Sequence, residues 1–236
     1  MPSLRTSEPS ILIGLQYRGH LSLGEHRARL GFAAYHWSII IVTPTNPTTG
    51  ARSNQHEFHR FDVTDGIVLD DAGTDVNPDR DWIFRRQTSN SLLEITRYLG
   101  AVRVGKISAS KIVEGDQKKL MRFFETVPLP RRESVGEEEE EEEEEEGPKE
   151  NCVTWVHSAL KALDAAAWCR LAEQPLDLDA LMVFALRHGD TRIGDLVTTP
   201  DVVDYERGEN KRGGAVGALV GAKEVHIVLI SNESTL

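Results

Sequence analysis

The sequence predicts an α+β fold in which an antiparallel sheet of about four to five strands is followed by packed helices. Two observations support this prediction. The first half of the chain holds runs of β-branched and aromatic residues, separated by turn-forming Pro, Gly, Asn and Asp. Beyond about residue 115, apolar residues recur instead at helical spacing. Strands that follow one another with short connections favour antiparallel pairing, and the early strands therefore predict a meander.

The strongest predicted strand is 36–42, which contains Trp37 and three isoleucines and stops at the turn residue Pro44. Side-chain alternation places His36 on one face of this strand and Trp37 on the other. The segment 64–80 is rich in Asp, Gly and Asn and is predicted as a surface loop. The predicted strands are 11–17, 36–42, 55–63, 81–87 and 98–107.

Three helices are predicted in the second half of the chain. The first covers 115–126, carries Leu120 on its apolar face and ends before Pro128. The second begins after Asn151 and extends to about residue 171. The third covers 177–188, with Gly189 as the residue that follows its last turn.

These elements predict a single interrupted domain. Its strand-rich half, together with one helix, covers 11–130, and its helical half covers 151–204. A flexible N-terminus, an acidic disordered insert and a glycine-rich tail with a last strand at 225–230 complete the organisation. The ranges of these three segments are 1–10, 131–150 and 205–236.

The formal charge of −11 is concentrated in the insert, where residues 137–146 are ten consecutive glutamates. Without them, 28 acidic residues remain against 27 basic ones, so the rest of the chain is close to neutral. A near-neutral surface offers no broad basic field for a phosphate backbone, and no nucleic-acid partner is predicted. The insert is interpreted as a solvated spacer, and the alternative is a docking segment for a basic protein.

No membrane span is predicted, because the longest apolar run, Ile39–Val42, is far shorter than the ~20 residues that a spanning helix needs. The first residues lack the apolar core of a signal peptide. On the predicted second helix, Cys152 and Cys169 would be roughly 25 Å apart, too far for a disulfide. Free thiols fit a reducing compartment, so a cytoplasmic location, or alternatively a nuclear one, is expected.

The segment Asn151-Cys152 points to a thiol site. Asparagine is a favoured N-cap residue, which places Cys152 at the first helical position, beside unpaired N–H groups and the positive end of the helix dipole. Both features favour the thiolate over the thiol. The same N–H groups could stabilise an oxyanion.

A thiol nucleophile needs a base, and His36 is the predicted one because it lies in the strongest strand. Of His56 and His59 on the neighbouring strand, their odd spacing allows only one to point at the site. Alternatives remain for each residue: Cys152 as a small buried apolar residue, and His36 as a hydrogen-bonded core histidine. A zinc site made by Cys152, His36 and His59 is a further alternative, which no CxxC or HxxxH spacing supports.

No cofactor is predicted. The glycine-rich stretch 212–223 lacks the preceding strand and the Lys-Ser/Thr ending of a phosphate-binding loop.

Seven short motifs follow one another within 11–190. They are Tyr17-Arg18-Gly19, His36-Trp37-Ser38-Ile39-Ile40-Ile41-Val42 with Pro44, Phe58-His59, Trp82-Ile83-Phe84, Gly105-Lys106-Ile107, Val127-Pro128 and Asn151-Cys152-Val153-Thr154-Trp155-Val156. In this order they resemble an uncharacterised family of small proteins from filamentous fungi, and the resemblance implies no established activity.

The order of a strand histidine, a second histidine on the next strand and a cysteine that opens a helix is similar to circularly permuted papain-like proteins. These include NlpC-type hydrolases and lecithin:retinol acyltransferase-like enzymes. The similarity implies that Cys152 is the nucleophile, His36 the base and His59 the group that orients His36. The acidic insert directly before Cys152 departs from that pattern.

The sequence therefore predicts a thiol-dependent hydrolase or acyltransferase whose substrate, a small molecule or a peptide, carries an amide, ester or thioester. The alternative function is a non-catalytic binding or accessory protein on the same fold.

Overall fold

The structure is a computed structural model that describes residues 8–44, 56–107, 117–131, 150–167, 169–171, 176–195 and 201–205. All of them belong to one unit of the chain, Met1–Glu206. The predicted acidic run at 137–146 and the predicted last strand at 225–230 lie outside the described residues.

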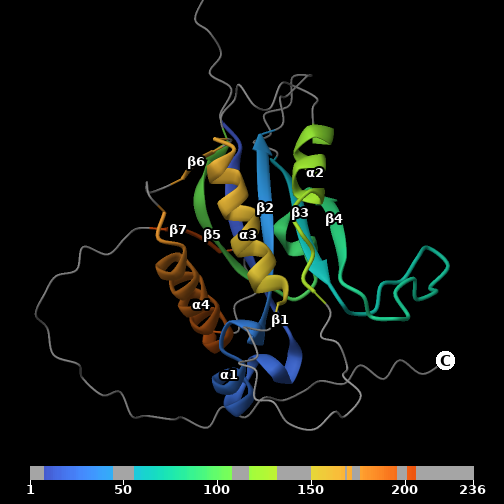
Figure 1. The fold of residues 1–236 in the computed structure, drawn as a ribbon. Helices are drawn as coiled ribbons and strands as arrows, with labels where there is room; N and C mark the ends of the chain where they lie inside the picture. The colour runs from blue at the N-terminus through green and yellow to red at the C-terminus, as the bar shows by residue number, and fades with distance from the viewer. Residues whose placement is uncertain are drawn as a thin grey trace, which may run out of the picture. The chain divides into compact units, whose positions relative to one another are not determined.

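The fold is α+β, as predicted, and its centre is an open, almost entirely antiparallel sheet of seven strands (Figure 1). The strand order is β4-β3-β2-β1-β5-β6, and β7 pairs in parallel with β5. The first four strands form the predicted meander, whereas β5 crosses over to pair with β1. The strands are β1 Ser10–Tyr17, β2 Tyr35–Pro44, β3 His56–Thr64, β4 Ile83–Ser89, β5 Tyr98–Ile107, β6 Cys169–Leu171 and β7 Val202–Asp204.

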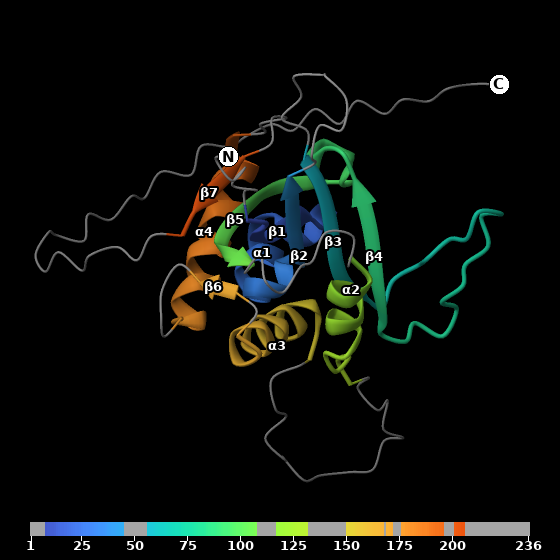
Figure 2. The same ribbon diagram turned by 90° about the horizontal axis from the view of Figure 1, so that it is seen from above.

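Helices α2, α3 and α4 contribute to the main apolar core, and Figure 2 shows α2 and α3 on one side of the curved sheet. A smaller cluster, which includes Leu12 and Ile40, covers the opposite face. The α-helices are α1 Gly24–Leu30, α2 Gln117–Glu125, α3 Cys152–Ala165 and α4 Leu178–Asp195, and the short 3₁₀ turns are η1 Gly19–Ser22, η2 Gly31–Ala34 and η3 Leu92–Glu94.

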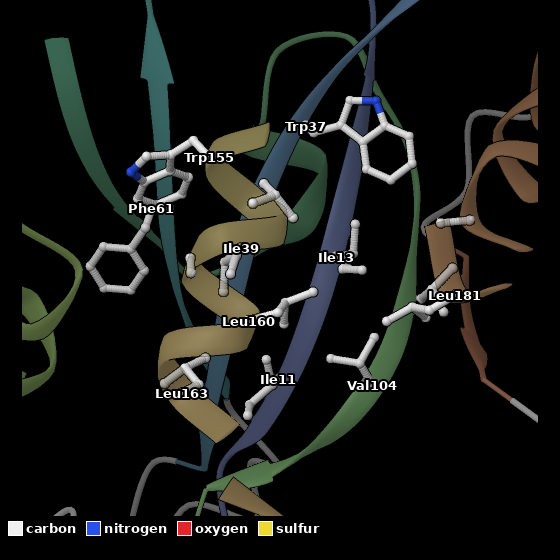
Figure 3. Packing of buried hydrophobic residues seen from close by; sticks show 14 of the residues in the cluster. Ile11, Ile13, Trp37, Ile39, Phe61, Val104, Trp155, Leu160, Leu163 and Leu181 are labelled. Atoms are coloured by element: carbon white, nitrogen blue, oxygen red, sulfur yellow. The ribbon is translucent and has the colours of Figure 1, made fainter. Parts of the chain in front are cut away.

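Alternation along β2 decides which side chains meet helix α3. Trp37, Ile39 and Ile41 are fully buried in the main core, where Ile39 packs near Leu160 of α3 (Figure 3). Ile40 belongs to the smaller cluster on the other face. The predicted two-faced pattern of this strand is therefore confirmed, and β2 is held in place from both sides.

Two predicted helix boundaries are wrong because tertiary contacts override local sequence preferences. Helix α3 ends at Ala165, Ala167 adopts a left-handed φ of 50°, and the chain then forms β6. Helix α4 continues through Gly189. A side chain at this position would meet Leu15 Cδ1 at 3.1 Å, so the glycine allows the helix to approach the sheet closely instead of ending it.

None of the helices in the described part of the chain combines the length and apolar character needed to cross a membrane.

Candidate thiol site

The first residue of α3 is Cys152, and Asn151 is its N-cap, as the sequence predicts; the structure shows that this cap is part of a capping box with Thr154. The Asn151 side chain accepts a hydrogen bond from the Val153 N–H at 2.8 Å. In return, Thr154 Oγ1 accepts one from the Asn151 N–H at 2.9 Å. The capping box orients the first turn of the helix, and the backbone N–H of Cys152 takes no part in its hydrogen bonds.

The sulfur of Cys152 takes the place of a backbone partner at the end of the sheet. Pairing between β2 and β3 stops at Ile39 and Phe61, so β3 offers no partner to the backbone of Trp37. The Trp37 N–H donates its hydrogen bond to Cys152 instead. The start of helix α3 is thereby joined to the start of β2, where His36 lies.

His36 is hydrogen-bonded to Cys152 on one side and to Asp62 on the other. Its Nε2 atom lies 3.1 Å from Asp62 Oδ2. The His36 side chain is 18% exposed and the Asp62 side chain is 0% exposed. The three side chains therefore form a series of thiol, imidazole and carboxylate, which is the arrangement that activates a thiol nucleophile.

Asp62 lies among cations as well as beside His36. Arg85 Nε is 2.8 Å from Asp62 Oδ1, and Arg60 Nε is 3.2 Å from Asp62 Oδ2. Arg85 stands directly opposite Asp62 in the β3–β4 register. These contacts satisfy a buried carboxylate that would otherwise be very unfavourable.

The mutual contacts shift the pKa values of all three groups. Burial alone would raise the pKa of Cys152, but the hydrogen bond and charge of His36, together with the Trp37 N–H, lower it overall. Burial would lower the pKa of His36, but its bonds to Asp62 and Cys152 raise it to about 9. Burial would raise the pKa of Asp62, yet His36 and then the two arginines hold it well below its usual range. All three shifts act in the direction of a thiolate–imidazolium pair beside a carboxylate.

His59 does not orient His36, and this part of the predicted site is corrected. In the register it lies opposite Ile41, five positions from His36 along β2 and about 17 Å away at ~3.3 Å per residue. The odd offset also puts the two rings on opposite faces of the sheet. Buried His59 contacts Glu57 at 3.1 Å and Thr88 Oγ1 at 3.1 Å instead.

The orienting position is occupied by Asp62, which sequence reasoning missed. If the register is continued by one residue beyond Ile39–Phe61, Asp62 lies beside Ser38, on the same face as His36. The sequence does contain a signal, because Asp is disfavoured within strands and here lies between the apolar residues Phe61 and Val63. A buried strand carboxylate needs a partner, and His36 is that partner.

A cavity of about 900 Å³ opens onto the thiol and the imidazole. Its size is that of a small-molecule site. Both Cys152 and His36 line it, although Cys152 is only 4% exposed. The other lining residues come mainly from the end of β1, from the segments that flank β4 and from Asn151.

Cys169 is buried on β6, where burial raises its pKa to about 11. It is therefore an inert counterpart to Cys152. The zinc alternative is not formed, since His59 lies far from the other two residues. Within the described part of the chain, no group of three or more His, Cys, Asp or Glu side chains is placed to hold a metal ion.

Comparison of the chain with protein-family models, with curated proteins and with solved structures found no match. The resemblance to the fungal family and to permuted papain-like proteins therefore stays a prediction, and any function has to be argued from the site.

Proposed function

We propose that the protein is a thiol-dependent hydrolase or acyltransferase that acts on an amide, ester or thioester. The observation that supports this proposal is the hydrogen-bonded series from Cys152 through His36 to Asp62 at the wall of a cavity. A strand histidine followed by a helix-opening cysteine also agrees with a permuted papain-like arrangement, with Asp62 in the orienting role.

In the first half-reaction, the Cys152 thiolate attacks the substrate carbonyl, and a C–S bond forms while the carbonyl electrons move to oxygen. The N–H of Cys152, outside the cap, is the first-turn donor for that oxyanion. The intermediate then expels the amine, alcohol or thiol, which takes the proton of the His36 imidazolium.

In the second half-reaction, neutral His36 removes a proton from water or from an acceptor nucleophile. That nucleophile attacks the acyl carbon, and the C–S bond breaks to restore the Cys152 thiolate and the imidazolium. Asp62 keeps the imidazole in the required orientation and stabilises its positive charge throughout.

Acyl-enzyme formation is the test. Incubation with 4-nitrophenyl acetate, or with an acetyl thioester of N-acetylcysteamine, is expected to place one acetyl group on Cys152, as identified by peptide mass mapping. In Cys152→Ser the thiolate is lost while an acceptor for the Trp37 N–H is kept, so turnover should fall by at least about 10⁴-fold. Cys169→Ser is the control and should behave like the wild type. Acetylation of Cys169 alone, or of neither cysteine, would refute the proposal and favour a binding protein.

The pH dependence should separate reactivity of the thiolate from acyl transfer. Acyl transfer needs Cys152 deprotonated and His36 protonated, so kcat/KM should decline as the pH rises through the His36 pKa of about 9. Alkylation of Cys152 by iodoacetamide needs only the thiolate and should not decline there. A kcat/KM that continues to rise above pH 9 would exclude His36 as the general acid.

A further inference from the structure

The cavity beside Cys152 is lined by an excess of basic residues, in contrast to the acidic chain as a whole. Its lining contains five arginines but only two carboxylates, whereas the chain carries −11. Two of these arginines are already neutralised, Arg80 by Asp75 and Arg85 by Asp62. The lining arginines are Arg18, Arg80, Arg85, Arg97 and Arg131, and the carboxylates are Asp65 and Glu150.

Arg18 and Arg97 lie on one wall of the cavity and are joined through the backbone. The N–H of Tyr17, which precedes Arg18, donates to the Arg97 carbonyl at 2.8 Å. Gln16 Nε2 donates to the Thr96 carbonyl at 3.1 Å, one residue before Arg97. The end of β1 is thus joined to the backbone of Arg97, and we call these two lining residues the Arg18–Arg97 subsite.

The backbone of Arg97 is strained in a way that favours a functional role. Its φ is 58°, a conformation that is unfavourable for residues other than glycine. Of the three non-glycine residues with positive φ in the described part of the chain, two, Arg80 and Arg97, line this cavity. Such strain persists where the surrounding structure enforces it, and it is concentrated at functional sites.

Within the described part of the chain, the recorded contacts leave donors of the subsite's guanidinium groups unused. Arg18 Nη1 donates to the Ala33 carbonyl at 2.7 Å, which holds one of its five N–H groups. Among the ion pairs recorded for the described residues, none includes Arg18 or Arg97. The Arg18 charge is also close enough to Cys152 to lower the pKa of its thiol.

We propose that the Arg18–Arg97 subsite binds an anionic group, a carboxylate or a phosphate, on the substrate whose acyl group Cys152 attacks. Fork-shaped guanidinium donors match both anions, and the position beside the thiol restricts that anion to the vicinity of the reacting carbonyl. This inference rests on the proposed acyl chemistry for its biological meaning. The preference for an anion can nevertheless be measured without turnover.

Iodoacetate and iodoacetamide form such a test, because they alkylate the same sulfur and differ in charge. We consider the second-order rate constant of iodoacetate at Cys152 divided by that of iodoacetamide. The thiolate fraction cancels in this ratio. It is expected to exceed the ratio for Cys169 in the unfolded chain. In Arg97→Gln, and separately in Arg18→Gln, the ratio should fall by about fivefold per charge removed, and raising the salt concentration should reduce it in the wild type. Arg187→Gln, on the exposed side of α4, is the matched control and should leave the ratio unchanged.

Acetate and inorganic phosphate then serve as competitors that protect Cys152 from iodoacetamide. The anion that protects at the lower concentration identifies the group that the subsite takes. A ratio that is unaffected by both arginine substitutions, or protection by neither anion, would overturn the subsite even if the acetyl-enzyme forms. Conversely, a charge-dependent ratio without any acetyl-enzyme would refute only the acyl chemistry.

Discussion

Replacing Asp62 by asparagine is expected to lower the free energy of unfolding by about 3–5 kcal/mol, because it removes the counter-charge from a buried cluster. The carboxylate is fully buried, and His36, Arg60 and Arg85 all contact it. Thermal unfolding of a chain of this size should shift downward by roughly 10 °C. Asp204→Asn, which breaks an exposed pair with Arg103, is the control and should change stability by less than about 1 kcal/mol.

The same variant should change how stability depends on pH. The pKa of His36 is raised from 6.5 to about 9, so its stabilising contribution is complete below pH 6.5 and is lost as the pH rises through about 9. The pKa of Asp62 is lowered, so its contribution is present above 3.8 and is lost on acidification below that value. The lowered pKa of Cys152 contributes in the opposite direction over the same pH range, so the comparison is made in the Cys152→Ser background. In urea titrations, Cys152→Ser should lose stability as the pH rises above 6.5, and Cys152→Ser with Asp62→Asn should lose much less. Parallel pH profiles would contradict the ion cluster.

Replacing His36 by alanine is expected to remove the activation of the thiol. In the wild type, the pH midpoint for alkylation of Cys152 by iodoacetamide should lie below the ordinary cysteine value of about 8.5. Without the imidazolium, burial is the dominant influence, and the midpoint should move to 8.5 or above. Turnover of an acyl substrate should fall by about 10²- to 10⁴-fold, the usual contribution of a positioned acid–base group.

His157→Ala is the matched control for this experiment, because His157 lies on the same helix, five residues after Cys152. Its midpoint for Cys152 alkylation should equal that of the wild type. The midpoint is read rather than the rate at one pH, because a thiolate of lower pKa is also a weaker nucleophile. If His36→Ala and His157→Ala gave the same midpoint, the Cys152–His36 pair would not exist.

The sheet could be predicted well from the sequence because its determinants are local. The ends of the five expected strands lie within two residues of the observed ends, and the expected bounds of β5 are the observed ones. Strands β6 and β7, of three residues each, are too short to show a period and form only through pairing with β5. The position of β5 beside β1 is likewise a matter of long-range contact, which alternation does not encode.

In the candidate site, too, local features could be predicted from the sequence and long-range pairing could not. The Asn151 cap, and with it the position of Cys152, is a local feature of four residues and was predicted. The choice between His59 and Asp62 as the orienting group depends on the register of β2 against β3. These strands are separated by eleven residues, 45–55, that the structure does not describe. A shift of one residue changes the face of every side chain, so sequence alone could not select the orienting group.

The end of the β2–β3 ladder makes Cys152 part of the architecture as well as of the chemistry. Its sulfur accepts the Trp37 N–H, for which β3 supplies no partner, and an alanine there would leave a buried donor unpaired at a cost of about 1–3 kcal/mol. Descendants of this protein that abandon the reaction would therefore keep an acceptor side chain at the position. Serine, asparagine or aspartate at position 152 would be compatible with a site that has lost its activity, because each can accept the Trp37 N–H. An aliphatic residue would first require the β2–β3 pairing to extend to Trp37. Evolutionary loss of the nucleophile is thus constrained by the sheet.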